Sequence, residues 1–261
     1  MLVLGGGILF HSFTLFALIG LIIGLGILEF YKLLDNTQLK ANKLLGLIAG
    51  LLFFGITCLY SIGYVPLNLL FIVVPVISAI FVSELYRKQE FPFQNIAITL
   101  FGVLYIAIPF SLLILIGFPE RSIAGYQANL IMGFFFLLWS NDTGAYLTGI
   151  SIGKHPMFPR ISPKKSWEGF AGGLFFTLVV AFIISKYFTA LPRIDWMVIA
   201  IIICIFGVWG DLIESMLKRS LQIKDSGNIL PGHGGILDRF DSVLFSAPIV
   251  FVYLQLKNLM F

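Results

Sequence analysis

The chain has 261 residues, of which 59% are hydrophobic and 11% charged, and its mean hydropathy is +0.99. Soluble domains are about half apolar and about one quarter charged, so this composition excludes an ordinary soluble protein and predicts one embedded in a lipid bilayer. The formal net charge of +4 becomes informative only when the charges are placed along the chain. No nucleic-acid partner is expected.

Cysteine and histidine give no sign of a zinc or redox site. The two cysteines, Cys58 and Cys204, lie far apart in apolar runs, where each is most simply a small apolar residue. The three histidines, His11, His155 and His233, share no metal-ligand spacing.

Apolar runs long enough to cross a bilayer follow one another along the chain. In hydrocarbon each backbone group must bond within its own segment, so each run is expected to be a helix. Residues 1–10 are also apolar, but they span only about half the length needed, and we interpret them as the outer end of a helix whose start is missing. The predicted fold is therefore an all-α, polytopic membrane helix bundle with eight full transmembrane helices plus an N-terminal partial one. The eight runs are 13–33, 43–62, 66–84, 95–117, 127–149, 170–188, 196–217 and 242–260.

Lys and Arg gather in alternate connections, which predicts that these connections face the cytoplasm. Two of them stand out by length and content, at 150–169 and 218–241, and function is expected there. We accordingly divide the chain into N-terminal transmembrane helices, 1–126, and a C-terminal catalytic region, 127–261. The basic residues of the four cytoplasmic connections are Lys40 and Lys43; Arg87 and Lys88; Lys154, Arg160, Lys164 and Lys165; and Lys218, Arg219, Lys224 and Arg239.

A polar stripe ends the run at 196–217. Asp211, Glu214, Ser215 and Lys218 have helical spacing and share one face. Such a stripe is costly to bury in lipid, so it should line a protein interior or a wet cavity. A helix end that emerges into water explains Lys218 equally well, but it explains Asp211 less well, because Asp211 lies roughly 10 Å deeper along the helix.

A second acidic pair, Asp238 and Asp241, stands at the start of the last run. Carboxylates brought together repel one another and rarely all stay ionised unless a cation lies between them. Oxygen ligands without Cys or His favour a hard ion such as Mg²⁺. The two acidic pairs therefore predict a magnesium site.

Glycines and basic residues fill the loop between the two acidic pairs. Glycine lets backbone N–H groups approach phosphate oxygens, and Lys or Arg neutralises their charge. The loop is thus typical of a polyphosphate site, and the alternative is a flexible basic loop at an anionic membrane surface. Its residues of this kind are Lys218, Arg219, Lys224, Gly227, Gly232, His233, Gly234, Gly235 and Arg239.

A third polar stretch interrupts the run at 127–149. Asn141 and Asp142 lie within it, and a buried Asp142 requires a partner or an ion. The basic loop that follows ends in Ser162-Pro-Lys-Lys-Ser-Trp-Glu-Gly169, for which the structural alternative is a surface loop with Ser166 as the N-cap of the next helix. Residues 149–154 do not form a P-loop, because they are one residue short between the glycines and follow a helix.

Together these motifs resemble the phosphatidate cytidylyltransferase (CDP-diacylglycerol synthase) family. The resemblance rests on Ser215-Met-Leu-Lys-Arg219, Lys224-Asp225 and Pro231-Gly-His-Gly-Gly-Ile-Leu-Asp-Arg-Phe-Asp241, which fill the family's signature in order and at its spacing. Residues 141–146 and 162–169 also look like family elements, whereas the N-terminal half matches only in hydropathy and in Glu29-Phe-Tyr-Lys32. The family normally begins with a basic cluster and a full first helix, so the short start here indicates truncation.

The resemblance implies a multi-pass enzyme of the bacterial inner membrane that transfers a cytidylyl group from CTP to phosphatidic acid and releases pyrophosphate. It implies Mg²⁺ held by Asp211 and Asp238 with support from Asp142, Glu214 and Asp241. The expected partners are CTP, phosphatidic acid and the bilayer, and a homodimer is also considered. The residues expected to be catalytic are Asp211, Lys218, Lys224 and Asp238, and those expected to bind substrate are Lys164, Lys165, Ser166, Ser215, Arg219, His233, Gly234, Gly235 and Arg239.

Two alternatives stay open. A related CTP-dependent membrane lipid enzyme, such as a polyprenol kinase or an archaeal-type lipid cytidylyltransferase, would share the metal and CTP but take another acceptor. A secondary transporter would also carry intramembrane acids. Its charges should lie near the middle of the bilayer on interrupted helices of repeated halves, whereas here they gather at the cytoplasmic helix ends.

Overall fold

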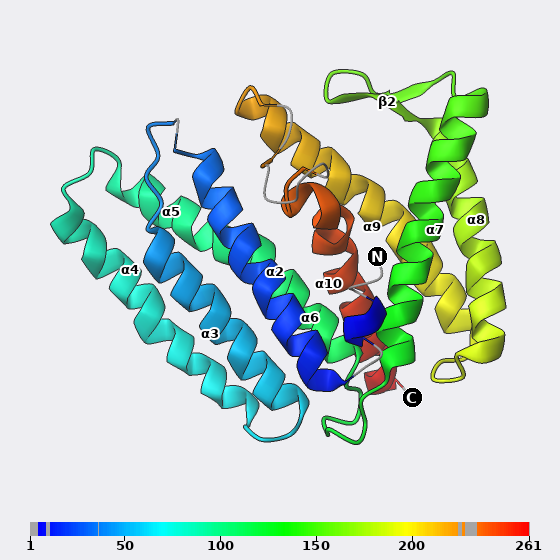
Figure 1. Cartoon of the computed structure of the whole chain (residues 1–261), viewed down its shortest axis with the longest axis horizontal. Coiled ribbons are helices and arrows are strands. Elements are labelled where there is room, and N and C mark those ends of the chain that lie inside the picture. The colour runs from blue at the N-terminus through cyan, green and yellow to red at the C-terminus, as the bar shows by residue number, and fades with distance from the viewer. Residues whose placement is uncertain (1–4, 9–10, 36, 224–225, 228–233, 261) are drawn as a thin grey trace. The chain divides into compact units, whose positions relative to one another are not determined.

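The computed structural model describes residues 5–8, 11–35, 37–223, 226–227 and 234–260, with side chains in the last helix through Lys257. The chain is predominantly helical (Figure 1). It divides into two compact units, Met1–Tyr126 with Ile223–Arg239, and Gln127–Gln222 with Phe240–Phe261.

The first unit is a bundle of apolar helices joined by short connections. Within it α3 packs against α2, α4 and α6. Its elements are α2 (Ser12–Leu33), α3 (Lys43–Ser61), the 3₁₀ helix η1 (Leu67–Ile72) leading into α4 (Val73–Arg87), and α5 (Pro92–Gly102), the π-helix η2 (Val103–Ala107) and α6 (Ile108–Ile116), which follow one another without a break.

A buried tyrosine holds three helices of the first unit together. The Tyr31 hydroxyl on α2 donates a hydrogen bond of 2.5 Å to the Thr99 carbonyl of α5. The ring fits because its neighbours lack side chains: a Cβ at Gly46 would lie 2.1 Å from the Tyr31 hydroxyl, and one at Gly102 would lie 2.5 Å from its Cε1. The glycines thus allow α2, α3 and α5 to meet around one side chain.

The second unit combines long helices with one short hairpin. In it α8 packs against both α7 and α9. Strands β1 and β2 are antiparallel, with Pro156 opposite Ser166 and Phe158 opposite Ser162. The elements are α7 (Ala128–Ile152), β1 (Pro156–Phe158), β2 (Ser162–Ser166), α8 (Trp167–Tyr187), α9 (Arg193–Ser220) and α10 (Leu237–Met260), of which residues from Phe240 onward belong to this unit.

The helical membrane architecture predicted from the sequence is confirmed. Seven helical segments of the described chain are long and apolar enough to cross a membrane: Ser12–Leu33, Lys43–Ser61, Leu67–Arg87, Pro92–Ile116, Trp167–Tyr187, Arg193–Ser220 and Leu237–Lys257. The run expected at 127–149 is the long helix α7, but it is not among the seven, because polar residues such as Asn141 and Asp142 lower its hydropathy. The hairpin within 150–169 was not predicted. Residues 5–8 are helical.

Candidate active site

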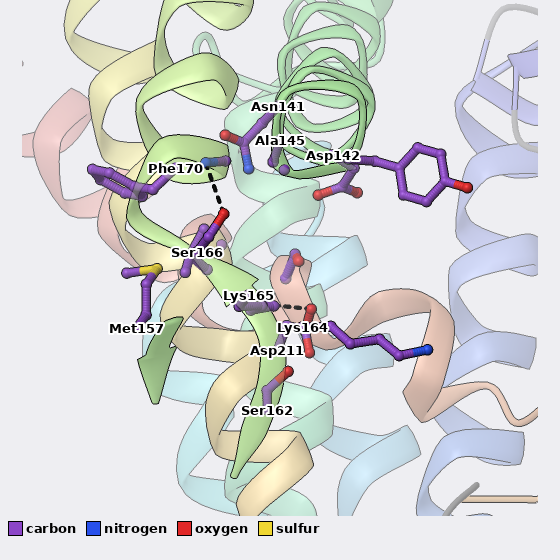
Figure 2. Close-up of a pocket in the computed structure, with 16 residues that line it drawn as sticks. Asn141, Asp142, Ala145, Met157, Ser162, Lys164, Lys165, Ser166, Phe170 and Asp211 are labelled. Atoms are coloured by element: carbon purple, nitrogen blue, oxygen red, sulfur yellow. Dashed lines mark hydrogen bonds and ion pairs between the residues drawn. The ribbon is translucent and has the colours of Figure 1, made fainter. Parts of the chain in front are cut away.

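A cavity of about 360 Å³ lies in the second unit, at the end of the helices that carries the hairpin (Figure 2). Helices α7, α8, α9 and α10 and both strands contribute to its wall. It is lined by Asn141, Asp142, Ala145, Tyr146, Gly149, Met157, Ser162, Lys164, Lys165, Ser166, Gly169, Phe170, Gly207, Val208, Asp211 and Ser242.

Glycines bring α7 and α8 into close contact beside the cavity. A Cβ at Gly172 would lie 2.0 Å from Thr148 Oγ1, and one at Gly173 would lie 2.7 Å from Asn141 Oδ1. Small residues at such crossings let membrane helices pack backbone to backbone. This close packing places the polar end of α7, with Asn141 and Asp142, in the cavity wall.

Helices α9 and α10 cross closely at a second pair of glycines. A Cβ at Gly210 would lie 2.4 Å from the Asp241 carbonyl oxygen, and one at Gly207 would lie 3.5 Å from Ser242 Cβ. The Asp241 carboxylate accepts a hydrogen bond of 2.6 Å from the Ser242 amide. Because Asp211 follows Gly210 directly, this crossing brings two acidic residues together although they are distant in sequence.

Asp211 makes two polar side-chain contacts in the cavity region. Its Oδ2 lies 2.5 Å from Lys165 Nζ on β2, as the dashed line in Figure 2 marks, and its Oδ1 accepts a hydrogen bond of 3.3 Å from the Ser215 hydroxyl one turn along α9. Asp142 and Asp241 both lie within electrostatic reach of Asp211 and Lys165. Several acidic groups thus lie near one ammonium, and carboxylate oxygen is the type of ligand that hard metal cations prefer.

The hairpin that carries Lys165 is fastened at its base to the start of α8. Glu168 accepts hydrogen bonds from the Lys154 amide at 3.1 Å and the His155 amide at 3.2 Å, and its Oε1 lies 2.5 Å from His155 Nδ1. The Trp167 amide donates to the His155 carbonyl at 3.0 Å. These contacts fix both ends of the hairpin, so that Lys164 and Lys165 are presented to the cavity from an anchored element.

Ser166 is the N-cap of α8, as the structural alternative predicted. Its Oγ accepts a hydrogen bond of 3.1 Å from the Gly169 amide. The same side chain also lines the cavity. Capping therefore explains Ser166 by itself, and contact with the nucleotide remains a prediction.

The polar stripe of α9 continues beyond Asp211 with an internal ion pair. Lys218 pairs with Glu214, and the two side chains are 16% and 1% exposed, respectively. Neither residue is in the wall of the cavity, and the next residue, Arg219, is exposed. The deeper half of the stripe thus borders the cavity, while the outer half is paired within the helix.

The remaining predicted site residues that the structure describes lie in the first unit. Asp238 Oδ2 accepts hydrogen bonds from the amides of Ser226 and Gly235, both at 3.0 Å, and lies 2.9 Å from Ser226 Oγ. Gly234 has a φ of +80°, a conformation that is unstrained only for glycine. Arg239 is exposed. Lys224 and His233 lie outside the described residues.

The predicted site residues thus fall into two groups. Asp142, Lys164, Lys165, Ser166 and Asp211 surround one cavity, with Glu214, Ser215, Lys218 and Arg219 farther along α9 and Asp241 on α10. Gly234, Gly235, Asp238 and Arg239 belong to the other unit. Within the described chain, no group of three or more His, Cys, Asp or Glu side chains is placed to hold a metal ion. A magnesium site shared by Asp211 and Asp238 therefore stays a prediction.

Four residues at these sites were given no role from the sequence, although Asn141 and Glu29 were noted there as parts of motifs. Asn141 is 2% exposed, and its Oδ1 has no hydrogen-bond partner among the residues described. Gly207 and Ser242 line the cavity beside Asp211. Glu29 is 2% exposed and accepts hydrogen bonds from residues around Asp238. The position of Glu29, an acidic residue inside an apolar run, was the signal that could have given it a role.

Fold and site together define a multi-pass helical membrane protein with a cavity of carboxylates and lysines, a set of groups suited to a phosphorylated ligand and a cation. The cytidylyltransferase family model matches residues 1–257. The chain belongs to this family.

The relatives support the assignment. The phosphatidate cytidylyltransferase of Bacillus subtilis (strain 168) is 38% identical over 240 residues, which cover 90% of this chain and 88% of that protein. The phosphatidate cytidylyltransferase of Staphylococcus haemolyticus (strain JCSC1435) is 36% identical over 233 residues, covering 88% and 86%. The enzyme of the same name from Staphylococcus aureus (strain COL) is 43% identical over 169 residues, covering 64% and 62%.

Proposed function

We propose that the chain transfers the cytidylyl group of CTP to the phosphate of phosphatidic acid, which yields CDP-diacylglycerol and pyrophosphate. The observation that carries the proposal is the 38% identity over 240 residues with a phosphatidate cytidylyltransferase. The match to the cytidylyltransferase family over residues 1–257 supports the same chemistry. The lysines and carboxylates of the cavity agree with a substrate that carries phosphates.

The proposed reaction is a displacement at phosphorus. An anionic oxygen of the lipid phosphate attacks the α-phosphorus of CTP and forms a new P–O bond. The bond between the α-phosphorus and the oxygen that bridges to the β-phosphorus breaks, and pyrophosphate leaves with that electron pair. Because the nucleophile is already ionised, the main task of the protein is to bring two anions together and to stabilise the charge that moves onto the leaving group.

The donor set around Asp211 fits Mg²⁺. The carboxylates of Asp142 and Asp211 line the cavity, and none of its described lining residues is a Cys or a His. Carboxylate oxygens without Cys or His nearby favour a hard cation. Lys165 shows that a positive charge is accommodated beside Asp211. We propose that Asp211 and Asp238 hold Mg²⁺. When bound, Mg²⁺ would neutralise phosphate charge and polarise the phosphoryl oxygens.

The supporting carboxylates of this proposal are Asp142, Glu214 and Asp241. Asp142 and Asp241 lie within electrostatic reach of Asp211, so their negative charge strengthens the attraction for a cation. Glu214 is paired with Lys218. We expect Glu214 to act through that lysine, because the ion pair fixes where the Lys218 ammonium stands.

The lysines of the hairpin are proposed to bind the phosphates of CTP. Lys164 and Lys165 both line the cavity and carry ammonium groups with three donors each, which suit phosphate oxygens. Ser166 accepts from the Gly169 amide, which leaves its own hydroxyl proton for a nucleotide acceptor. The further phosphate-binding residues of the proposal are Ser215, Lys218, Arg219, Lys224, His233, Gly234, Gly235 and Arg239.

The membrane topology of the proposal has eight full spans plus the N-terminal partial one in the bacterial inner membrane. Helix α7 would be the span that adds to the seven apolar ones, because its 25 residues are enough to cross a bilayer. The basic residues of the loops at 150–169 and 218–241 favour a cytoplasmic location for both loops, which is where CTP is made. A homodimer also remains an expectation.

The experiment that tests the function uses the purified full chain in detergent or nanodiscs with CTP, phosphatidic acid and Mg²⁺. We expect equimolar pyrophosphate and CDP-diacylglycerol. Asp211→Asn, purified in the same way, controls for contaminating enzyme, and Asp35→Asn is its matched control, because Asp35 is an exposed aspartate paired with Lys43.

The acceptor distinguishes the related chemistries. Phosphatidic acid, a polyprenol and an archaeal-type ether lipid are offered separately. Product formed from a polyprenol, with none from phosphatidic acid, would assign a CTP-dependent kinase instead. An absence of product from folded protein with every acceptor would contradict the proposed function.

A further inference from the structure

Glu29 is a buried acid within the membrane helix α2, and its carboxylate is enclosed by hydrogen-bond donors. Only 2% of the residue is exposed. Glu29 Oε1 accepts from the Ser226 hydroxyl at 2.5 Å and from the Leu237 amide at 3.1 Å, and Oε2 accepts from the Ile236 amide at 2.8 Å. All three donors come from the segment that carries the signature loop and the start of α10.

The contacts of Glu29 with the Ile236 and Leu237 amides explain how α10 begins. The opening amides of a helix have no partner within the helix and need an outside acceptor. The residue before Leu237 is Ile236, whose apolar side chain cannot cap. The Glu29 carboxylate takes this role from another helix, and its negative charge is favourable at the positive end of the α10 dipole. The start of α10 is thus fixed to α2.

Two glycines of the loop leave room for this carboxylate. A Cβ at Gly235 would lie 2.1 Å from Glu29 Oε1, and one at Gly227 would lie 2.9 Å from Glu29 Oε2. Two glycines of the basic loop, whose spacing in the sequence suggests an approach to phosphate, therefore permit the approach of Glu29. Their absence of side chains is required on this face of the loop whatever the loop binds.

Ser226 connects Glu29 to Asp238. Its hydroxyl lies 2.5 Å from Glu29 Oε1 and 2.9 Å from Asp238 Oδ2. The same Asp238 oxygen accepts from the amides of Ser226 and Gly235. Asp238 is therefore positioned by a loop that is itself hydrogen-bonded to Glu29. A substitution at Glu29 should change the position of Asp238 through the Ser226 hydroxyl and the amides of Ser226 and Gly235.

We propose that Glu29 is a positioning residue for the cytidylyl transfer, which orients Asp238 for its cation through Ser226 and the start of α10. The inference rests on the proposed function for the role of Asp238 as a ligand of Mg²⁺. A helix cap alone does not call for this arrangement, because a serine or aspartate at position 236 would cap α10 without burying a distant carboxylate. The carboxylate itself is required, since both of its oxygens accept and it has no donor to repel the surrounding N–H and O–H groups.

Two variants test the inference by readouts that do not depend on turnover. Glu29→Gln keeps the shape but turns an NH₂ group toward a donor, and Ser226→Ala removes the shared hydroxyl without altering a buried charge. Hydrogen–deuterium exchange of peptides over residues 234–240 reports how strongly the backbone amides of the loop and of the start of α10 are protected. Binding of Mn²⁺, followed by its electron paramagnetic resonance signal, reports the cation site in the absence of substrates.

For Glu29→Gln we expect faster exchange over 234–240 and Mn²⁺ affinity weaker by about 10–100-fold, the usual effect of losing a group that orients a metal ligand. Ser226→Ala should weaken Mn²⁺ in the same direction. The matched control is Glu84→Gln, a buried acid of the same unit paired with Arg87; it should lower the melting temperature without changing either readout.

If exchange over 234–240 were unchanged in Glu29→Gln, Glu29 would not stabilise the loop and the start of α10. If Mn²⁺ affinity were unchanged in both variants, Glu29 would not orient Asp238 for the cation. A failure of the proposed function would give a different set of results. In that case Asp238→Asn would bind Mn²⁺ like the unaltered chain, while exchange over 234–240 in Glu29→Gln would still rise.

Discussion

Lys165 Nζ on strand β2 lies 2.5 Å from Asp211 Oδ2 on helix α9. The pair joins an anchored hairpin to a membrane helix across the cavity wall (Figure 2). A cation that binds Asp211 would compete with the Lys165 ammonium for the same oxygen. Lys165 would then be released toward the phosphates that accompany the cation, so that one lysine serves the empty and the filled cavity in turn.

Lys165→Met is therefore expected to strengthen Mn²⁺ binding in the absence of nucleotide, because it removes the positive charge that competes at Asp211. The measurement is a Mn²⁺ titration followed by electron paramagnetic resonance. Lys154→Met is the control, since Lys154 belongs to the same loop but is not in the cavity wall. Weaker Mn²⁺ binding in Lys165→Met would show that the lysine supports the cation instead of competing with it.

Lys164→Ala combined with Lys165→Ala is expected to raise the KM for CTP while the KM for phosphatidic acid stays nearly unchanged. Hydrogen bonds to charged groups are worth about 1.5–3 kcal/mol, so the KM for CTP should rise by about tenfold or more. A binding contact shared by ground and transition states appears in KM. A selective rise in the KM for the lipid would mean that the hairpin serves the other substrate.

Asp211→Asn and Asp238→Asn are each expected to abolish turnover while leaving a folded, membrane-inserted protein. The amide keeps the shape of the side chain but loses the charge that attracts a divalent cation. Activity is measured over a range of Mg²⁺ concentrations, with Asp35→Asn as the exposed control. Substantial activity of either variant at ordinary Mg²⁺ would remove that residue from the metal site.

Cysteine substitutions at Ser162 and Ser226 test the predicted orientation. In a background with Cys58 and Cys204 replaced, both positions should resist a membrane-impermeant thiol reagent in intact cells and react after lysis, because the basic flanking residues predict a cytoplasmic location for these loops. Ser226 is 3% exposed, so its reaction after lysis is followed in denaturant. Labelling of either position in intact cells would reverse the topology.

The helices could be predicted from the sequence because each long apolar run has only one way to satisfy its backbone in a bilayer. The starts of helices were harder. The last run was expected from residue 242, but α10 begins at Leu237, since the acidic Asp238 and Asp241 occupy its first turns and carry no hydrophobic signal. The hairpin was missed because Pro156–Phe158 is too short and Ser162–Ser166 too polar for a strand pattern.

Only part of the candidate site could be predicted from the sequence, for a similar reason. Charged residues in apolar surroundings, such as Asp142 and Asp211, are visible in a sequence, and both line the cavity. Partners distant in sequence are not visible. Nothing in the spacing pairs Lys165 with Asp211, or Glu29 with Ser226, which is 197 residues away, because these contacts are made by tertiary packing.

Close helix crossing is the basis of the last prediction. Gly210→Ala would place a Cβ 2.4 Å from the Asp241 carbonyl oxygen and 3.2 Å from Ser242 Cα. These are backbone atoms, so no rotamer change can relieve the contact and α9 must move away from α10. Overpacking of this kind costs about 1–3 kcal/mol, and it also separates Asp211 from Asp241. We expect a lower melting temperature in detergent together with a loss of activity larger than the loss of folded protein.

Gly55→Ala on α3 is the matched control, because a Cβ at that position meets nothing within 4 Å and alanine is the better helix former by up to about 1 kcal/mol. Its melting temperature should be unchanged or higher, and its activity should be retained. Both variants are compared by thermal unfolding and by CDP-diacylglycerol formation at equal amounts of folded protein. If Gly210→Ala were as stable and as active as Gly55→Ala, α9 and α10 could not cross at Gly210, and the juxtaposition of Asp211 with Asp241 would have to be abandoned.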